Sequence, residues 1–236
     1  MPKAATPKDN DARLRALDAY AILDTPAEPD YDAVTQLASS VCDTPISVIN
    51  FIAEGRQWFK SELGLGVRET PLDPSICAHA ILENELFVVC DTTEDPRFAD
   101  NPLVTGDPHL RFYAGALLRS REGLPLGTLC VLDTKPRELT DHQRQSLATL
   151  ADHVRNMLEL RRTTRESVEL AESLQDALAA RQRLVATVAH DLRTPLHVIH
   201  LAAELLQSAE VDSQTHEALA GRLGRASASM TRLVED

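Results

Sequence analysis

The longest stretch of this chain without Gly or Pro runs from after Pro136 to Pro195, and it limits the possible folds more than any other feature. Thr140 and Gln143 fit a capping box at its start, in which a threonine hydroxyl and a glutamine side chain satisfy free backbone groups of the first helical turn. Apolar residues then recur at helical spacing, at 147, 150, 154 and 157 or 158, and again between 170 and 188. The pattern therefore predicts one helix of more than fifty residues.

A helix of this length cannot bury its whole apolar stripe against one compact domain. Beyond 170 the apolar spacing resembles a heptad repeat, after an interruption around Arg161–Arg165. Such spacing is typical of coiled coils. We therefore expect the helix to pair with a second copy of the chain, and a single surface helix is the alternative.

Two further helical segments follow Pro195. The first is predicted to reach about Gln207, and the polar turn SAEVDS at 208–213 separates it from the second, which begins near Gln214. One face of the second segment carries His216, Leu219, Leu223, Ala226, Met230 and Leu233. Two antiparallel helices joined by a short loop form a hairpin, and two hairpins make a four-helix bundle. We expect an all-helical region from 161 to 236 that forms a homodimer.

The N-terminal part has a different pattern. Its first ten residues are polar, and we expect them to be disordered. Helical spacing predicts helices at 12–22 and 30–42. Strands are predicted at 45–52, 56–64, 86–91, 112–118 and 126–133, with the first two paired across residues 53–55. This order predicts an α+β domain with an antiparallel sheet flanked by helices.

Composition excludes several classes of function. The net charge of −12 over 236 residues argues against a nucleic-acid partner, because phosphate binding needs a basic surface. No window approaches the ~18 consecutive apolar residues of a membrane span. The N-terminus lacks the apolar stretch of a signal peptide, so we expect a cytoplasmic protein. The four cysteines show no metal-binding spacing, which favours free thiols and argues against a structural metal site.

The stretch AHDLRTPL at 189–196 contains the candidate catalytic residues. His190 falls off the apolar stripe that Val188 and Leu192 continue, so we expect it to be exposed. Imidazole has an ordinary pKa of about 6.5, and its neutral form offers a free ring nitrogen as a nucleophile. Asp191 can take the proton of the other ring nitrogen and act as a general base. The alternative is a solvated surface histidine on a coiled coil.

The seven residues from His190 to Leu196 resemble the phosphoacceptor box of sensor histidine kinases, in the dimerisation and phosphotransfer domain called HisKA. RLVATVAH before the box and SASMTRLVED after it are similar to the two helices of that domain. The resemblance implies ATP-dependent autophosphorylation on His190 and transfer to an aspartate in the receiver domain of a response regulator. It also implies that Thr194 positions water for dephosphorylation of the regulator. Most family members carry Glu where this chain has Asp191.

Pro195 has a role that its own chemistry predicts. It removes one backbone donor and clashes with the carbonyl of Asp191, so the helix is expected to bend beside His190. A bend at this point gives the bundle two arrangements, which a signalling switch requires.

Residues 23–160 resemble a GAF domain of the kind that precedes histidine kinases and diguanylate cyclases. The resemblance is carried by runs such as SVINFI, RQWFKS, PLDPSICAHAI, DPRFADNPLV, HLRFYAGALL and LGTLCVLD. It implies an unknown small-molecule ligand, with Cys77 and His79 as candidate binding residues. Some photoreceptor GAF domains attach a bilin to a cysteine directly followed by histidine, whereas Ala78 intervenes here. A bilin, haem or redox sensor is one alternative, and a small-residue helix lining a pocket is another.

The predicted organisation has four parts. They are an N-terminal extension and helix at 1–22, a GAF sensor domain at 23–160, a signalling coiled-coil helix at 161–183, and a HisKA domain at 184–236 that is truncated at its C-terminal end. No Asn-rich or Gly-rich nucleotide-binding box occurs, so we expect the ATP-binding domain, with its ATP and Mg²⁺, to be missing. The chain alone is then expected to hold no cofactor and to be inactive as a kinase. A non-catalytic GAF ligand-binding and dimerisation module is the alternative function.

Overall fold

A computed structural model describes residues 2–206 and 213–235, without the side chains of 213, 214, 234 and 235. The chain divides into two compact units, Met1–Glu166 and Ser167–Asp236. Helix α5 (Asp141–Leu206) contributes to both of them. Residues 208–212 of the predicted polar turn, and the last residue of the chain, lie outside the described residues.

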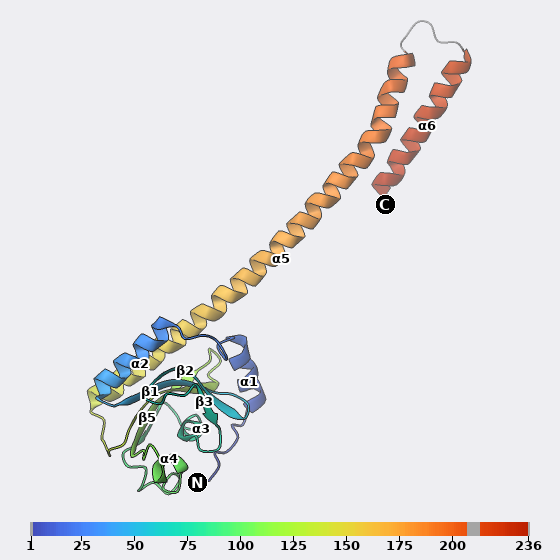
Figure 1. Cartoon of the computed structure of the whole chain (residues 1–236). Coiled ribbons are helices and arrows are strands. Elements are labelled where there is room, and N and C mark those ends of the chain that lie inside the picture. The colour runs from blue at the N-terminus through green and yellow to red at the C-terminus, as the bar shows by residue number, and fades with distance from the viewer. Residues whose placement is uncertain (1, 207–212, 236) are drawn as a thin grey trace. The chain divides into compact units, whose positions relative to one another are not determined.

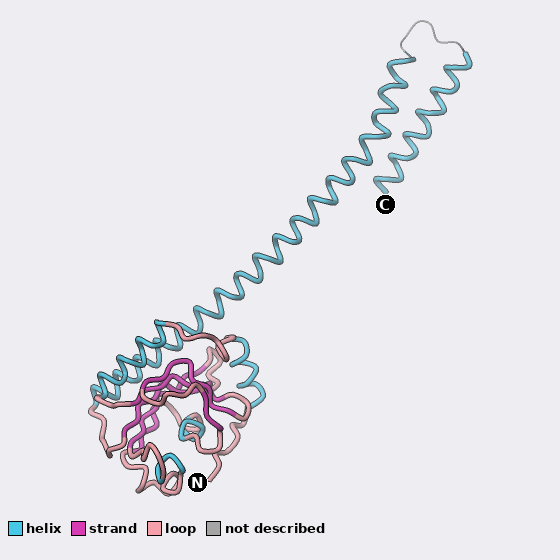
Figure 2. Tube along the Cα trace, viewed as in Figure 1, coloured by secondary structure: helices cyan, strands magenta, loops and turns pink. Residues whose placement is uncertain are grey.

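The first unit is built on a six-stranded sheet with the order β3-β2-β1-β6-β5-β4, in which every neighbouring pair is antiparallel. Figure 2 shows the strands of this sheet in magenta. The strands are β1 (Ile46–Ile52), β2 (Arg56–Leu63), β3 (Glu69–Pro71), β4 (Leu86–Val89), β5 (Phe112–Arg119) and β6 (Pro125–Asp133). The predicted hairpin of the first two strands is confirmed, with Phe51 opposite Trp58. The antiparallel α+β fold predicted from the sequence is confirmed as well.

Each face of the sheet has its own hydrophobic core. Helices α1 (Asn10–Ala19) and α2 (Pro29–Cys42) and the start of α5 pack on one face, which we call the α5-side core (Figure 1). Helices α3 (Ile76–Ala80) and α4 (Pro102–Thr105) pack on the other face, the α3-side core. Successive side chains of a strand point to opposite faces. In β5, Phe112 and Ala114 therefore join the α5-side core, and Tyr113 joins the α3-side core.

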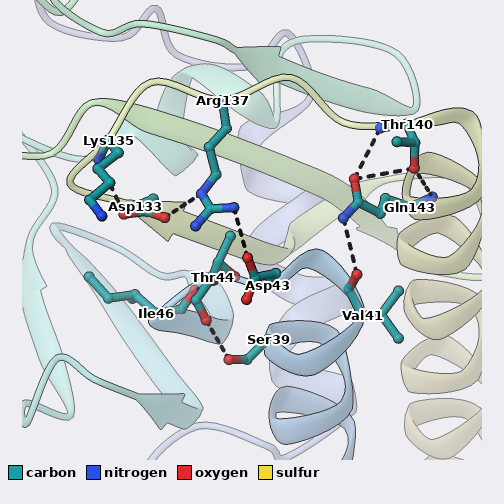
Figure 3. A network of polar contacts seen from close by, with 10 residues as sticks. All are labelled: Ser39, Val41, Asp43, Thr44, Ile46, Asp133, Lys135, Arg137, Thr140 and Gln143. Carbon is teal, nitrogen blue, oxygen red and sulfur yellow. Dashed lines mark hydrogen bonds and ion pairs between the residues drawn. The ribbon is translucent and has the colours of Figure 1, made fainter.

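Polar contacts fix the start of α5 (Figure 3). The predicted capping box is present: the Thr140 amide donates to Gln143 Oε1 at 3.0 Å, and the Gln143 amide donates to Thr140 Oγ1 at 3.2 Å. Gln143 Nε2 also donates to the carbonyl of Val41 in α2, at 3.1 Å. The guanidinium of Arg137 pairs with the buried carboxylate of Asp133 and lies 3.4 Å from Asp43 Oδ2. The start of α5 is thereby attached to α2, and the loop just before it is attached to the end of β6.

The second unit is an antiparallel pair formed by the C-terminal part of α5 and helix α6 (Ser213–Glu235). Pro195 and Ala202 of α5 and Leu219 and Ala226 of α6 are buried in this unit. The structure differs from the prediction of a separate helix after Pro195, because α5 runs through this residue to Leu206. One missing backbone donor removes one hydrogen bond of the helix, and the bonds on either side of it remain.

Candidate functional site

His190 lies on α5 in the second unit, and its side chain is 77% exposed. Its Nδ1 atom lies 3.2 Å from Oδ1 of Asp191. When Nδ1 carries the proton, this contact is a hydrogen bond from the ring to the carboxylate, and the lone pair of Nε2 remains free. The structure therefore brings together the two residues that sequence reasoning paired, and the ring keeps one nitrogen available to an incoming group.

Thr194 and Pro195 lie one turn further along α5. Thr194 is exposed, on the same side of the helix as His190, since residues four apart are neighbours on a helix surface. Pro195 is buried and has no amide hydrogen to donate to the carbonyl of Asp191. These positions agree with the surroundings expected for a phosphoacceptor, and the roles inferred for both residues stay predictions.

Apolar side chains on α5 are exposed along the stretch that the sequence predicts to be a coiled coil. They are Val168, Leu170, Leu174, Leu178, Leu184, Val185 and Val188. Leu196 is also exposed, and Leu192 and Ile199 are only half-buried. By contrast, Leu147 and Val154, nearer the start of the same helix, are completely buried in the α5-side core. One helix thus has a covered apolar stripe in the first unit and an uncovered one in the second.

A cavity of about 260 Å³ lies in the α3-side core. Cys77 of α3 and Cys130 of β6 both line it, and their sulfur atoms are 3.8 Å apart. The hydroxyl of Tyr113 donates to Cys77 Sγ at 3.2 Å, and Asn50 Nδ2 donates to the same sulfur at 3.4 Å. Gly115 leaves room for this arrangement, because a Cβ atom there would lie 2.3 Å from the Tyr113 hydroxyl.

His79 does not share this cavity with Cys77. Its ring packs edge-on against Phe98, with the centroids 5.2 Å apart, and its Nε2 lies 3.2 Å from the carbonyl oxygen of Pro2. Partial burial lowers the pKa of His79 below its ordinary value. The structure thus separates the two candidate ligand residues, because positions two apart on a short helix point in different directions.

Sequence reasoning missed the residues that surround Cys77. Cys130, Tyr113 and Asn50 come from three different strands, and 53 positions separate the two cysteines. Strand alternation alone places Tyr113 and Cys130 on one face, but only the fold brings α3 to that face.

Within residues 2–206 and 213–235, no group of three or more His, Cys, Asp or Glu side chains is arranged to hold a metal ion. The same residues include no helix with the length and apolar character needed to cross a bilayer.

Comparison with known proteins adds the family relationships. Residues 13–158 match the family model described as GAF domain, and residues 180–236 match the one described as His Kinase A (phospho-acceptor) domain. One curated relative is the cyclic di-GMP phosphodiesterase PA2567 of Pseudomonas aeruginosa. It is 45% identical over 131 residues, which make up 56% of this chain and 22% of that protein. The chain therefore spans about a fifth of the length of this relative.

Solved structures show a related fold. The GAF domain of PixJ from Thermosynechococcus elongatus, in its blue-light absorbing form, has a TM-score of 0.51 at 13% identity and covers 69% of this chain and 96% of that one. The GAF domain of a phosphoenolpyruvate-protein phosphotransferase from Acinetobacter has a TM-score of 0.48 at 16% identity and covers 65% and 94%. The likeness to the PixJ domain supports the fold of the first unit.

Proposed function

Because the chain belongs to the GAF domain family and carries a HisKA phospho-acceptor domain after it, we propose that it is the sensor and phosphoacceptor part of a two-component histidine kinase. GAF followed by HisKA is an architecture of sensor histidine kinases. The observation that carries the proposal is the exposed ring of His190, held at Nδ1 by Asp191 inside the segment that matches the HisKA model.

The proposed reaction uses both nitrogens of the His190 ring. Nε2 attacks the γ-phosphorus of ATP, which is bound with Mg²⁺ by a separate catalytic domain; the N–P bond forms while the bond to the bridging oxygen of ADP breaks. The ring becomes cationic as the bond forms, and the Asp191 carboxylate stabilises that charge and accepts the Nδ1 proton. In a second step the phosphoryl group passes to an aspartate of a response regulator receiver domain.

Thr194 and Pro195 have supporting roles in this proposal. The Thr194 hydroxyl is on the His190 side of α5, where it can position the water that removes the phosphoryl group from the regulator. Pro195 weakens the helix one turn after the phosphoacceptor, so a bend costs less there than elsewhere in α5.

Dimerisation is the third element of the proposed function. HisKA domains typically dimerise, and the exposed apolar stripe of α5 between Val168 and Val188 supplies a surface of the kind that two copies bury in a coiled coil. We propose a homodimer through this stripe and the helical pair of the second unit. For the sensor domain we propose an unidentified small molecule as the ligand, bound in the 260 Å³ cavity. We place the protein in the cytoplasm, where ATP is available.

Phosphorylation in trans tests the proposal. The chain is incubated with the catalytic domain of an active sensor histidine kinase and ATP labelled on its γ-phosphate. We expect a label on the wild-type chain that is lost in acid and kept in base, as a phosphoramidate requires. His190→Gln removes the nucleophilic nitrogen and is expected to abolish the label.

His197→Gln is the matched control, since His197 is exposed on α5 one heptad further on. It is expected to leave the label unchanged. A label that persists in His190→Gln, or a wild-type chain that takes up none, contradicts the proposal. The second outcome favours the alternative of a non-catalytic GAF module.

A further inference from the structure

The α3-side core contains a pair of thiols that phosphotransfer does not use. Cys77 and Cys130 are both buried, and they come from α3 and from β6. Their sulfur atoms are 3.8 Å apart. A disulfide bond is ~2.05 Å long, so an approach of about 1.8 Å would join them. Cys42 is buried in the opposite core, and Cys90 lies on the surface.

The surroundings of the two sulfur atoms are unequal. The Tyr113 hydroxyl donates to Cys77 Sγ, the Asn50 amide lies within donor distance of both sulfur atoms, and either thiol can donate to the other. Hydrogen bonds to sulfur favour the thiolate over the thiol. Burial alone raises the pKa of Cys77, but the bonds from Cys130, Tyr113 and Thr128 outweigh burial and lower the pKa to about 7.

Cys130 has the opposite character. Burial, together with its hydrogen bond to Cys77, raises the pKa of its thiol well above the ordinary value. Near neutral pH, Cys77 therefore supplies a thiolate and Cys130 remains a protonated neighbour. A two-step oxidation needs these two forms, because the thiolate reacts with the oxidant first and the second thiol then forms the disulfide.

The cavity gives a small oxidant access to both sulfur atoms. Its volume is about 260 Å³, and Leu65, Val67 and Leu103 contribute to an otherwise largely apolar wall. A hydroperoxide is small enough to enter, whereas bulky disulfides such as oxidised glutathione would have to displace the wall. The geometry thus selects the oxidant by size.

We propose that Cys77 and Cys130 form a redox pair that reacts with small hydroperoxides. The Cys77 thiolate attacks the terminal peroxide oxygen; the S–O bond forms, the O–O bond breaks, and the other oxygen takes up a proton from solvent and leaves as water or an alcohol. The Cys130 sulfur then attacks Cys77 Sγ; the S–S bond forms, the S–O bond breaks, and water leaves with the Cys130 proton. The two thiols lose two electrons, and the hydroperoxide gains them.

Peptide mapping of the full chain after treatment with hydrogen peroxide tests this pair. The protein is reduced, exposed to a small excess of peroxide near neutral pH, alkylated and denatured. We expect the loss of two hydrogen atoms in mass and a cross-link between Cys77 and Cys130. Trypsin leaves Cys77 and Cys90 on one peptide, so a second cleavage after Glu83 and Glu85 is needed to separate them.

Single substitutions assign the order of the two steps. Cys77→Ser is expected to abolish the oxidation, and Cys130→Ser is expected to stop at a sulfenic acid on Cys77 that a dimedone probe captures. Cys90→Ser, at the exposed thiol, is the matched control and is expected to leave the cross-link intact. Absence of the cross-link in the wild type, or a cross-link through Cys42 or Cys90, overturns the proposal. The wild-type map decides this even if a variant fails to fold.

Alkylation rates test the thiolate separately from the cross-link. The rate at Cys77 is expected to rise with pH around about 7 in the wild type. Tyr113→Phe removes one donor to the sulfur and is expected to slow alkylation at neutral pH about fivefold, by raising the pKa of the thiol. Tyr31→Phe changes a buried tyrosine of the opposite core and is expected to have no effect. Equal rates in Tyr113→Phe and the wild type contradict the proposed stabilisation of the thiolate. None of these readouts depends on phosphorylation of His190.

Discussion

Leu147 and Leu174 lie on the same helix, and the same substitution at both sites separates folding from dimerisation. Leu147 is fully buried in the α5-side core, whereas Leu174 is 59% exposed in the single chain. Alanine is a slightly better helix former than leucine, so neither Leu→Ala change weakens α5 by itself. Any loss must come from packing, within the chain at Leu147 and between chains at Leu174.

The magnitudes follow from the buried area. Truncating a fully buried leucine to alanine costs about 3–4 kcal/mol, so Leu147→Ala is expected to lower the unfolding free energy of the first unit by that amount. Complete burial of a leucine side chain contributes about 2 kcal/mol. Leu174 is 59% exposed in the single chain, so burying that fraction in a dimer contributes about 1.2 kcal/mol per chain. A symmetric dimer loses this twice, about 2.4 kcal/mol, which weakens dimerisation about 50-fold.

Two measurements distinguish the effects. Sedimentation equilibrium gives the dimer dissociation constant, and urea unfolding followed by the fluorescence of Trp58, the single tryptophan, reports on the first unit. We expect Leu174→Ala to change the first measurement and leave the second within about 0.5 kcal/mol, as for surface substitutions. Leu147→Ala is expected to do the reverse. A dissociation constant for Leu174→Ala within about threefold of the wild type would refute the packing of this stripe against a second copy, since one buried leucine is worth more than that.

Three smaller perturbations follow from contacts in the first unit. Arg137→Met leaves the buried Asp133 carboxylate without its cation and is expected to lower the unfolding free energy by about 3 kcal/mol in urea titrations. Gln143→Ala removes half of the capping box and the bond to Val41, for an expected loss of about 1 kcal/mol in the same titrations. Burial lowers the pKa of His79 in the folded protein, so folding favours the neutral imidazole. The stability that this gives is fully present above the pKa of the unfolded chain, ~6.5, and it is lost as pH falls through the pKa of the folded protein. Melting temperatures between about pH 7.5 and 5 are therefore expected to fall less steeply in His79→Gln than in the wild type.

Local patterns were sufficient to predict the long elements of the fold. The β-branched run at 45–52 and its neighbour at 56–64 form β1 and β2, and the capping box at Thr140 begins α5 within one residue. The short edge strand β3 was not predicted, because three residues that include Pro71 have no measurable alternation. The separate helix predicted after Pro195 was wrong, since one missing donor does not end a helix whose other bonds remain.

The two candidate sites differ in how far sequence could reveal them. His190 and Asp191 are adjacent in the chain, so a motif and a helical period suffice to predict their contact. Cys77 and Cys130 meet only because α3 packs under β6, and no local pattern encodes a contact across 53 positions. The sequence suggested Cys77 and His79 because they are close in the chain, but their side chains point in different directions on α3, and the ligand-binding role of each stays a prediction.

Strand β6 contributes side chains to both cores of the first unit. Cys130 points into the α3-side core, while its neighbours Leu129 and Val131 point into the α5-side core that includes Leu147 of α5. Protein interiors are close-packed and have low compressibility. We therefore expect that moving Cys130 toward Cys77 shifts β6 together with the side chains on its opposite face. The same strand ends at Asp133, whose carboxylate pairs with Arg137 just before α5 begins. Strand β6 therefore contributes to both cores of the first unit, and it is tied through Arg137 to the loop that precedes α5.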